Sequence, residues 1–492
     1  MSPVPEDRLQ DRNEAPVRPE RAFVLYWMIA ARRSRWNFGL QRSIEWAREL
    51  GLPLVILEPL RAGYRWSSER HHRFLIEGMR DNQSAFASKP VTYHPYVEPA
   101  AGEGQGLLEA LAAKAAVVVT DESPMFFLPR MIDAAARKLS VRLESVDGVG
   151  ILPLRAPDKT FARAYDFRRY LHKNLVPHLG AGPSRDPLAR KELPTPIELD
   201  SDVLKRWPAA DLEALLKPGG LDDIDFECSV PPVDFEGGSR SGERTLKAFL
   251  GGCLKTYADA RGQVDVSSRL SAHLHFGHVG SHQVFDVVAR HAGWKPSQID
   301  PGFHGKNMGW WNASPDVDAF LDQLVTWREL GAQSAFGNGK FGTYAGLPDW
   351  ARRTLAEHAN DPRPHVYDLM AFDRAATHDD IWNAAQRQLR VEGRIENYLR
   401  MLWGKKILHW SASPEEGFAI ALELNQRYAI DGRDPNSDSG IGWVFGLFDR
   451  AWGPEREVFG KIRYMTSDST RRKLRLKPYL ERFGPNRSLF EG

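Results

Sequence analysis

The sequence predicts two structural domains, an α/β N-terminal domain built on a doubly wound parallel sheet and an all-α C-terminal domain. Over about residues 22–155, short apolar runs alternate with helical patterns, which is typical of βαβ units and a parallel sheet. Beyond residue 240 the pattern changes to long helical stretches without strand alternation. The length of 492 residues also exceeds the roughly 250 to 300 residues at which a single hydrophobic core stops growing.

The α/β domain is expected over residues 22–182, and its first strand at 22–29 reads AFVLYWMI. No glycine fingerprint follows this strand, so nothing in the domain predicts a nicotinamide site. Further strands are expected at 53–58, 91–97, 116–120 and from about 141, and the helices between them include 37–50 and 131–139.

Three other stretches complete the expected organisation. The first 21 residues are charged and contain several prolines, which predicts a disordered tail over 1–21. Residues 183–240 are rich in Pro, Gly and Asp and predict an interdomain linker with a few helical turns. Residues 241–492 are expected to form the helical domain.

The composition is that of a globular protein, with 42% apolar and 26% charged residues. No apolar run approaches the roughly 20 residues that a membrane helix needs, and the N-terminus has no hydrophobic core like that of a signal peptide. We therefore expect a cytoplasmic protein without a membrane partner. Cys228 and Cys253 lie in no CxxC or histidine-paired pattern, which predicts neither a disulfide framework nor a zinc site.

The formal net charge is only +2, but basic residues gather near the C-terminus. Such a stretch could contact a phosphate backbone, and it could equally be a solvated basic face near the end of the chain. The acidic residues of this stretch are Asp468 and Glu481, and its basic residues are Lys461, Arg463, Arg471, Arg472, Lys473, Arg475, Lys477, Arg482 and Arg487.

The stretch 257–280 offers hydroxyl groups where a loop turns into a helix. Ser267, Ser268 and Ser271 lie where free backbone N–H groups and hydroxyls could hold a pyrophosphate, although serines also cap helices without any ligand. The nearby histidines have a spacing that fits no common zinc site and no carboxylate or cysteine beside them, so no metal is predicted; they are His273, His275 and His278.

Tryptophans form a second group. Trp403 and Trp410 are seven residues apart in LRMLWGKKILHW, which places them on one helix face with a rise of about 10 Å, and Trp382 stands in IWNAAQ. Periodicity alone is equally typical of core packing. A third group could close around a polar ring system or form a structural ion-pair network; it comprises Asn397, Arg400, Asn425, Asp431, Arg433 and Asp434.

Taken together, these motifs resemble the photolyase and cryptochrome family, and in detail the class II cyclobutane pyrimidine dimer photolyases. The resemblance covers nearly the whole chain. It is carried by VLYWM at 24–28, SSRLSAHLHFG at 267–277, IWNAAQ at 381–386, LRMLWGKKILHW at 399–410, LNQRYAIDGRDPN at 424–436 and FGKIRYM at 459–465.

The resemblance implies an FAD cofactor held by the helical domain. Arg400 is expected to pair with Asp431, and Asn425 to face flavin N5. The complete set that the resemblance assigns to FAD is Tyr257, Ser267, Ser268, Arg269, Leu270, Ser271, Asn397, Arg400, Asn425 and Asp431.

The resemblance also implies a lyase, deoxyribodipyrimidine photolyase, that acts as a monomer on UV-damaged DNA and is nucleoid-associated when bound. The lesion would leave the duplex to reach the excited reduced flavin. The catalytic set is Gln323, Trp382, Trp403, Trp410 and Asn425, with an electron relay running from Trp410 at the surface through Trp382 to Trp403 beside the flavin. The DNA-binding set is Trp327, Trp443, Arg450 and Arg463.

Several positions depart from the family pattern. Gln323 replaces a glutamate that contacts the dimer, Glu396 and Asn397 replace His-Gly, and Leu402 replaces a tyrosine. RRSRWNF at 32–38 replaces an acidic run, which leaves open whether an antenna chromophore of deazaflavin or folate type is bound. The alternatives to dimer repair are a cryptochrome-like blue-light photoreceptor and repair of (6-4) photoproducts.

Overall fold

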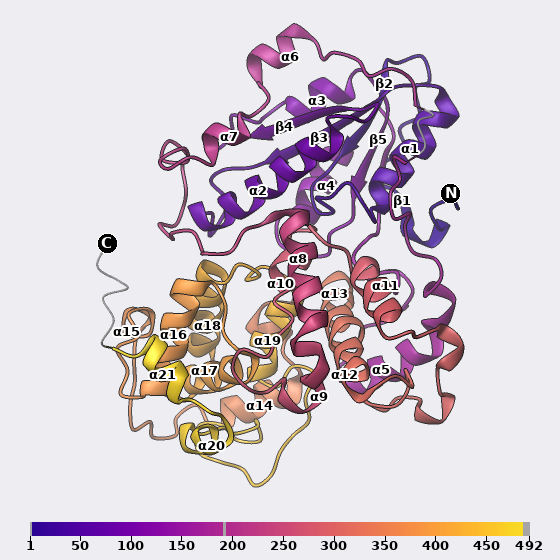
Figure 1. Cartoon of the computed structure of the whole chain (residues 1–492). Coiled ribbons are helices and arrows are strands. Elements are labelled where there is room, and N and C mark those ends of the chain that lie inside the picture. Colours follow the sequence, from indigo (N-terminus) through magenta and orange to yellow (C-terminus); the bar gives the residue numbers. More distant parts are fainter. Residues whose placement is uncertain (1, 190–192, 486–492) are drawn as a thin grey trace. The chain divides into compact units, whose positions relative to one another are not determined.

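The computed structural model describes residues 2–189 and 193–485, which divide into two compact units (Figure 1). Each unit is assembled from segments that are far apart in the sequence. Unit 1 comprises Met1–Asp158, Leu175–Lys247 and Leu270–Gly293, and unit 2 comprises Lys159–Asn174, Ala248–Arg269 and Trp294–Gly492.

Unit 1 is built on a six-stranded sheet with the order β1-β6-β5-β2-β3-β4. Strands β2 to β6 run parallel to one another. The first strand, β1, pairs antiparallel with β6 and forms one edge of the sheet. The strands are β1 Leu9–Asp11, β2 Phe23–Trp27, β3 Leu54–Leu60, β4 Thr92–Val97, β5 Ala115–Asp121 and β6 Leu143–Val146.

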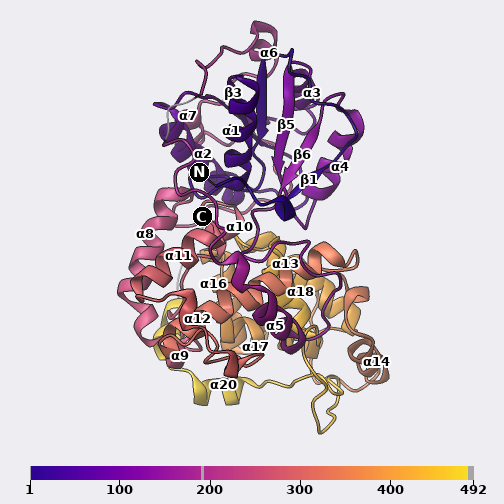
Figure 2. The same ribbon diagram turned by 90° about the vertical axis from the view of Figure 1, so that its right-hand side faces the viewer.

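Helices cover both faces of this sheet, α1 and α2 on one side and α3 and α4 on the other (Figure 2). Alternate residues of β2 serve the two faces, because Val24 and Tyr26 pack with α1 while Leu25 and Trp27 pack with α3 and α4. The predicted doubly wound α/β fold is confirmed. The helices are α1 Phe38–Leu50, α2 Glu69–Phe86, α3 Leu107–Ala112 and α4 Leu128–Lys138.

The disordered tail expected at the N-terminus is not found in residues 2–21. A 3-10 turn at Glu6–Arg8 (η1) leads into β1, which pairs with β6. The Arg8 side chain is fully buried and donates hydrogen bonds to the carbonyl oxygens of Asp147, Gly150 and Ile151. Polar composition suggested disorder, but backbone pairing and this arginine order the segment.

The stretch expected as an interdomain linker, 183–240, packs into unit 1 where it is described. It forms α6 Ser201–Arg206 and α7 Leu212–Leu215, and it buries Trp207 against the sheet and Leu212 against α2. The other helices of unit 1 are η2 Val176–His178, α10 Ser271–His275, α11 Ser281–His291 and α8 Gly238–Gly251, which belongs to unit 1 as far as Lys247.

Unit 2 is helical, and its described residues contain none of the six strands. Its centre is α17, which packs against α16, α18 and α19. The predicted all-α second part is confirmed. The elements are α5 Ala164–Asn174, η3 Cys253–Thr256, α9 Tyr257–Ala260, η4 Pro296–Gln298, η5 Pro301–Phe303, α12 Pro315–Leu321, the π-helical turn η6 Asp322–Trp327, α13 Arg328–Gly337, η7 Tyr344–Gly346, α14 Asp349–Glu357, α15 Leu369–Asp373, α16 Asp380–Glu392, α17 Asn397–Trp410, α18 Pro414–Tyr428, α19 Pro435–Val444, α20 Ser467–Lys473 and α21 Lys477–Phe483. In the described part of the chain, no helix is long and apolar enough to cross a membrane.

Candidate functional site

Three tryptophans lie in succession inside unit 2. Trp382 is on α16, and Trp403 and Trp410 are on α17. The Trp382 ring is parallel to that of Trp403, with an interplanar angle of 5° and centroids 6.4 Å apart, and it is inclined at 66° to the ring of Trp410, with centroids 6.3 Å apart. Trp382 therefore stands between the other two rings.

Hydrogen bonds fix the two parallel indoles. Trp382 Nε1 donates to the carbonyl oxygen of Trp403 at 2.9 Å, and Trp403 Nε1 donates to Oε1 of Gln386 at 2.9 Å. A buried N–H group that lacks a partner costs about 1–3 kcal/mol, so both bonds hold the rings in these orientations. Asp379 caps α16 through the backbone N–H of Trp382 and sets where that helix begins.

The sequence had predicted that Trp410 lies at the surface. This prediction is wrong, because Trp410 is only 1% exposed. The rings of Tyr367 and His378 cover it, with centroids 5.9 Å and 4.7 Å from the Trp410 ring, and the Lys406 ammonium lies 4.9 Å from that ring. A heptad spacing places a side chain on a helix face but does not show what covers that face.

The polar residues around the C-terminal end of α18 form a fixed group. Arg400 Nη2 lies 3.7 Å from Oδ1 of Asp431, which is the predicted pairing. Asn425 is buried, and its Nδ2 donates to the carbonyl oxygen of Gly432 at 3.2 Å and to Ser437 Oγ at 3.1 Å. Glycine is required at 432, since a Cβ there would lie 2.6 Å from the backbone oxygen of Asn425.

Arg433 and Asp434 are both buried beside this group. Asp434 caps α19, since its side chain accepts a hydrogen bond from the Asn436 N–H at 2.8 Å, and it lies 3.9 Å from Arg328. Asp434 therefore has a structural role as a helix cap. Asn425 is held in place by its hydrogen bonds but caps no helix.

The serine loop, residues 265–269, lies near the N-terminus of α17. Burial raises the pKa of Glu396, and the charges of Arg394, Asp265 and Arg269 also act on it. Ser267 and Ser268 are half-buried in this loop, and Arg269 adopts a left-handed conformation with φ of 55°. Asn397, the first residue of α17, is exposed.

The other residues of the predicted FAD set are placed as follows. Tyr257 is buried against Phe249 and Phe320, and burial raises its pKa to about 12. Leu270 and Ser271 belong to unit 1, where Ser271 begins the five-residue helix α10.

Gln323 and Trp327 lie in the π-helical turn η6 between α12 and α13. Such turns are rare and occur often at functional sites. Trp327 Nε1 donates to Oδ2 of Asp322 at 3.2 Å, and Asp322 accepts two hydrogen bonds from the buried guanidinium of Arg168, at 2.9 and 3.1 Å. The turn therefore rests on a buried ion pair with α5, and both Gln323 and Trp327 are left half-buried.

Four side chains form what we call the arginine–tryptophan cluster: Trp443, Arg450, Trp452 and Arg463. The Arg463 guanidinium lies 5.6 Å from the Trp443 ring and 5.0 Å from the Trp452 ring, and that of Arg450 lies 4.5 Å from the Trp452 ring. Sequence reasoning missed Trp452, although a tryptophan two residues after Arg450 is a signal that could have found it. Cations and aromatic rings together are typical of surfaces that bind single-stranded or flipped nucleotides.

Lys405, on α17, lies beneath the arginine–tryptophan cluster and is fully buried. Its Nζ lies 5.2 Å from the Trp443 ring and donates to the carbonyl oxygen of Val444 at the end of α19. Burial lowers its pKa to about 7. The lysine was visible in the sequence, but its burial and its partner were not.

The basic stretch near the C-terminus is partly used within the fold. Lys461 pairs with Glu455, Arg471 with Asp380 and Arg482 with Glu392. The Lys473 ammonium lies 4.1 Å from the Tyr398 ring. Arg472, Arg475 and Lys477 are exposed, and Arg487 lies outside the described residues.

The three histidines considered for a metal lie in unit 1. Burial lowers the pKa of His273 to about 4, and His278 Nδ1 accepts a hydrogen bond from the backbone N–H of Gly238 at 2.9 Å. Among residues 2–189 and 193–485, no group of three or more His, Cys, Asp or Glu side chains could hold a metal ion.

A comparison with family models found no match. Among curated proteins, the chain is 33% identical over 482 residues to the deoxyribodipyrimidine photo-lyase of Methanothermobacter thermautotrophicus, covering 97% of this chain and 98% of that protein. The proteins of the same name from rice and from Potorous tridactylus are 30% and 29% identical, with coverage of 93% and 97% of this chain and 86% and 82% of theirs. The chain belongs to the photolyase/cryptochrome family.

Solved structures of the photolyase/cryptochrome family share the fold. A class III photolyase from Agrobacterium tumefaciens matches with a TM-score of 0.62 and 18% identity, over 94% of this chain and 86% of its own. A Synechocystis cryptochrome matches with a TM-score of 0.64 and 15% identity, over 94% and 88%. At this identity the structures show the fold alone.

Membership of this family implies an FAD cofactor, and the side chains of unit 2 fit one. The serine loop offers hydroxyls and the Arg269 guanidinium to a diphosphate. The buried Asn425 amide, held by two hydrogen bonds, can face a ring nitrogen that changes protonation, because an amide carries no charge of its own. The Arg400–Asp431 pair supplies polar groups beside such a ring.

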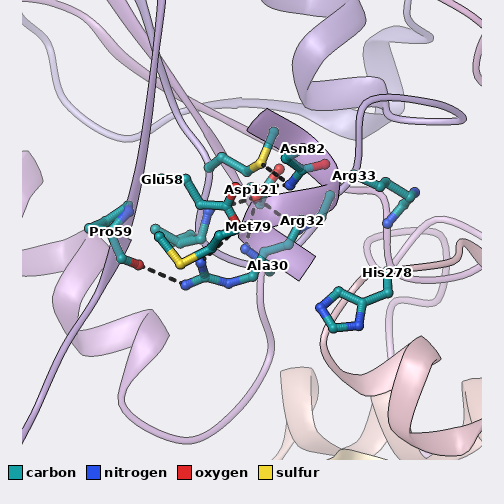
Figure 3. Close-up of polar contacts among 12 residues, drawn as sticks. Ala30, Arg32, Arg33, Glu58, Pro59, Met79, Asn82, Asp121 and His278 are labelled. Carbon is teal, nitrogen blue, oxygen red and sulfur yellow. Dashed lines mark hydrogen bonds and ion pairs between the residues drawn. The ribbon is translucent and has the colours of Figure 1, made fainter. Parts of the chain in front are cut away.

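Residues 32–38 replace the acidic run that bears on whether an antenna chromophore is bound. In this family member, Arg32 and Arg33 of that run form polar contacts within unit 1 (Figure 3). Arg32 Nη1 lies 3.2 Å from the buried Glu58 carboxylate, which also accepts from Asn82 at 2.8 Å. Arg33 Nη1 donates to the carbonyl oxygen of Gly277 at 2.9 Å. Both arginines therefore stabilise the loop between β2 and α1.

Proposed function

We propose that this chain is a class II cyclobutane pyrimidine dimer photolyase, an enzyme that uses blue light to split the dimer in UV-damaged DNA. The single observation that carries the proposal is the half-buried ring of Trp443, which has the Arg463 guanidinium at 5.6 Å and the Nζ of the buried Lys405 at 5.2 Å from its centroid. The names of the curated relatives and the motifs shared along the whole chain support it.

The aromatic side chains would hold the flipped lesion. Trp327 stands on the π-helical turn and Trp443 on α19, and α13, which follows that turn, packs against α19. Stacking of a base on an aromatic ring is worth roughly 1–3 kcal/mol. Two flipped pyrimidines can share these two rings, and the poor stacking of a dimer within the duplex lowers the free energy needed to flip it.

The surrounding polar groups would orient the lesion. Arg450 and Arg463 would neutralise phosphates beside it, which makes DNA affinity fall as salt rises. Gln323 would donate a hydrogen bond from its amide to a carbonyl of the dimer, but it has no proton to transfer. It would therefore position the lesion rather than act as an acid.

When bound and fully reduced, FAD supplies the photoexcited electron that opens the cyclobutane ring and accepts it back afterwards. The protein would prepare that state through Trp403, Trp382 and Trp410, whose rings form a continuous series within α16 and α17. By analogy with class II photolyases, Trp403 would be nearest the flavin. Asn425 would hold its amide against flavin N5, and Arg400 and Asp431 would hold the ring in place.

The proposal is tested by repair of defined lesions. The FAD-loaded, chemically reduced protein is bound to oligonucleotides that carry either one cyclobutane dimer or one (6-4) photoproduct, illuminated in the blue, and assayed for restored thymines. We expect restoration from the cyclobutane dimer alone. Restoration from the (6-4) photoproduct alone would assign the chain to that repair instead.

A photoreceptor of cryptochrome type is the second candidate function, and Gln323 favours it, because the amide cannot replace an acid at the lesion. It predicts that light reduces the bound flavin through the tryptophans while neither lesion is repaired. The same assay, read beside the flavin spectrum, separates the two functions.

A further inference from the structure

The segment that carries most of the arginine–tryptophan cluster, residues 449–463, is a long loop that folds back on itself. The N–H of Trp452 donates to the carbonyl oxygen of Lys461 at 2.9 Å, and further along the loop Arg456 and Gly460 exchange two backbone hydrogen bonds. This described segment contains no helix and none of the six strands. Its shape therefore depends on what the rest of unit 2 provides.

One turn of this segment is buried and strained. Val458 and Phe459 are fully buried, whereas most of residues 449–463 are exposed or half-buried. Val458 has a φ of 66°, in the left-handed region that a β-branched residue rarely adopts. Such a conformation persists only where surrounding groups hold it, and it occurs often at functional sites. The turn at Val458 therefore needs partners outside the segment.

The end of α14 and the turn that follows it supply those partners. Asp361 Oδ2 accepts a hydrogen bond from the backbone N–H of Val458 at 2.8 Å. Thr354 Oγ1 accepts one from the backbone N–H of Lys461 at 3.0 Å. His358 Nδ1 lies 2.6 Å from the same Asp361 oxygen, and it must be the donor, since a carboxylate only accepts. We call Thr354, His358 and Asp361 the α14 anchor.

The α14 anchor and the segment fit closely together. Gly460 has a φ of 50°, and a Cβ there would collide with Thr354 Oγ1 and lie 2.7 Å from Cδ2 of His358. The hydrogen bond from the Val458 N–H, together with the His358 ring, holds the pKa of Asp361 below its ordinary value of 3.8. Asp361 is therefore a carboxylate at neutral pH and a strong acceptor for that N–H.

We propose that Asp361 and His358 are positioning residues for the binding of damaged DNA. By holding the turn at Val458, they keep the guanidinium groups of Arg450 and Arg463 where the phosphates beside a lesion would lie. The inference rests on the proposed function, which makes the arginine–tryptophan cluster a DNA-binding surface. A segment that already has its bound shape loses less conformational freedom when DNA binds, so the α14 anchor acts on affinity. Repair within the bound complex does not depend on it.

Binding in the dark tests the proposal. The FAD-loaded protein is titrated with a duplex that carries one cyclobutane dimer, over a series of salt concentrations. Asp361→Ala should raise the Kd at least several-fold and make its salt dependence shallower by about one to two phosphate contacts. Asp361→Asn should keep most of the affinity, because its amide oxygen can still accept from the Val458 N–H. The matched control is Glu357→Ala, an exposed carboxylate at the end of α14, which should change neither quantity.

Limited digestion with trypsin probes the segment without DNA. Cleavage after Arg450 should be at least several-fold faster in Asp361→Ala than in the native protein, at equal flavin content. If Asp361→Ala loses its flavin, Thr354→Val takes its place, because it removes only the acceptor for the Lys461 N–H. An unchanged Kd or an unchanged rate of cleavage would overturn this inference alone. A native protein that binds the dimer no better than undamaged duplex would overturn the proposed function, whereas faster cleavage in the variant would still show that the α14 anchor holds the segment.

Discussion

The Trp382 indole N–H donates to the carbonyl oxygen of Trp403 at 2.9 Å, while the two rings lie parallel with centroids 6.4 Å apart. A side chain of α16 thus binds the backbone of α17 at the residue whose ring it faces. Trp403 also has its own acceptor in Gln386. The two rings are held at a fixed separation, which is what stepwise electron transfer needs.

Trp403→Phe should abolish light-driven reduction of oxidised FAD, because a phenyl ring is much harder to oxidise than an indole. Repair by chemically reduced protein should be nearly unchanged, since it bypasses the relay. The flavin spectrum under illumination checks the first expectation and the repair assay checks the second. Retained photoreduction would refute the role of Trp403.

Gln323→Glu should raise the quantum yield of dimer splitting. A carboxyl group can share a proton with the charge that develops on the dimer carbonyls, whereas the amide can only donate a hydrogen bond. Single-turnover repair at fixed photon dose measures the change. A yield that stays the same or falls would show that glutamine is the adapted residue in this chain.

Asp322→Asn should destabilise the protein by about 3–5 kcal/mol, because it leaves the buried Arg168 guanidinium without its counter-charge. Denaturant unfolding measures that loss. Asp318→Asn is the matched control. Asp318 lies in the preceding helix α12 and is also buried, and it accepts a hydrogen bond from the Gly309 N–H but belongs to no ion pair among the described residues. If Asp322 also positions Trp327, affinity for a dimer-containing oligonucleotide should fall more in Asp322→Asn than in the control.

Lys405→Met should change how stability depends on pH. The folded protein holds the pKa of Lys405 at about 7, against an ordinary value of 10.5, so between these values the unfolded chain binds more protons. The lysine's contribution to stability therefore rises with pH from about 7 to about 10.5, and its unfavourable effect is fully present below 7. The gain in melting temperature from Lys405→Met should be largest near pH 6.5 and shrink towards pH 9.5.

The control for Lys405→Met is Lys340→Met, which replaces an exposed lysine of the same unit. The difference in melting temperature between Lys340→Met and the native protein should not vary with pH. A Lys405→Met difference that is equally flat would mean that the pKa of Lys405 is the same in the folded and the unfolded protein.

Local patterns in the sequence predicted both halves of the fold, because β2 and β5 of unit 1 are mostly apolar runs and helices of unit 2 such as α14 and α16 show helical periodicity. They failed at the N-terminus, where β1 is short and polar and is held by pairing with β6 and by Arg8. Order there depends on residues more than a hundred positions away, which no local pattern contains.

The site followed the same division. Trp403 and Trp410 share a helix, so their spacing was visible, and the Arg400–Asp431 pair was predicted by resemblance. The cover of Trp410 by Tyr367 and His378 joins loops to a helix, and the Asp322 support of Trp327 depends on Arg168 from another segment. Such contacts arise only when distant segments pack together.

The central claim is light-driven repair, and the most direct measurement is the yield of restored thymines from a duplex that carries a single cyclobutane dimer. It is taken with the FAD-loaded, reduced protein in single turnover, once under blue light and once in the dark. We predict restored thymines only in the light, with an action spectrum that follows the absorption of reduced flavin. No restoration under light, with flavin bound and reduced and the oligonucleotide bound, would contradict the account.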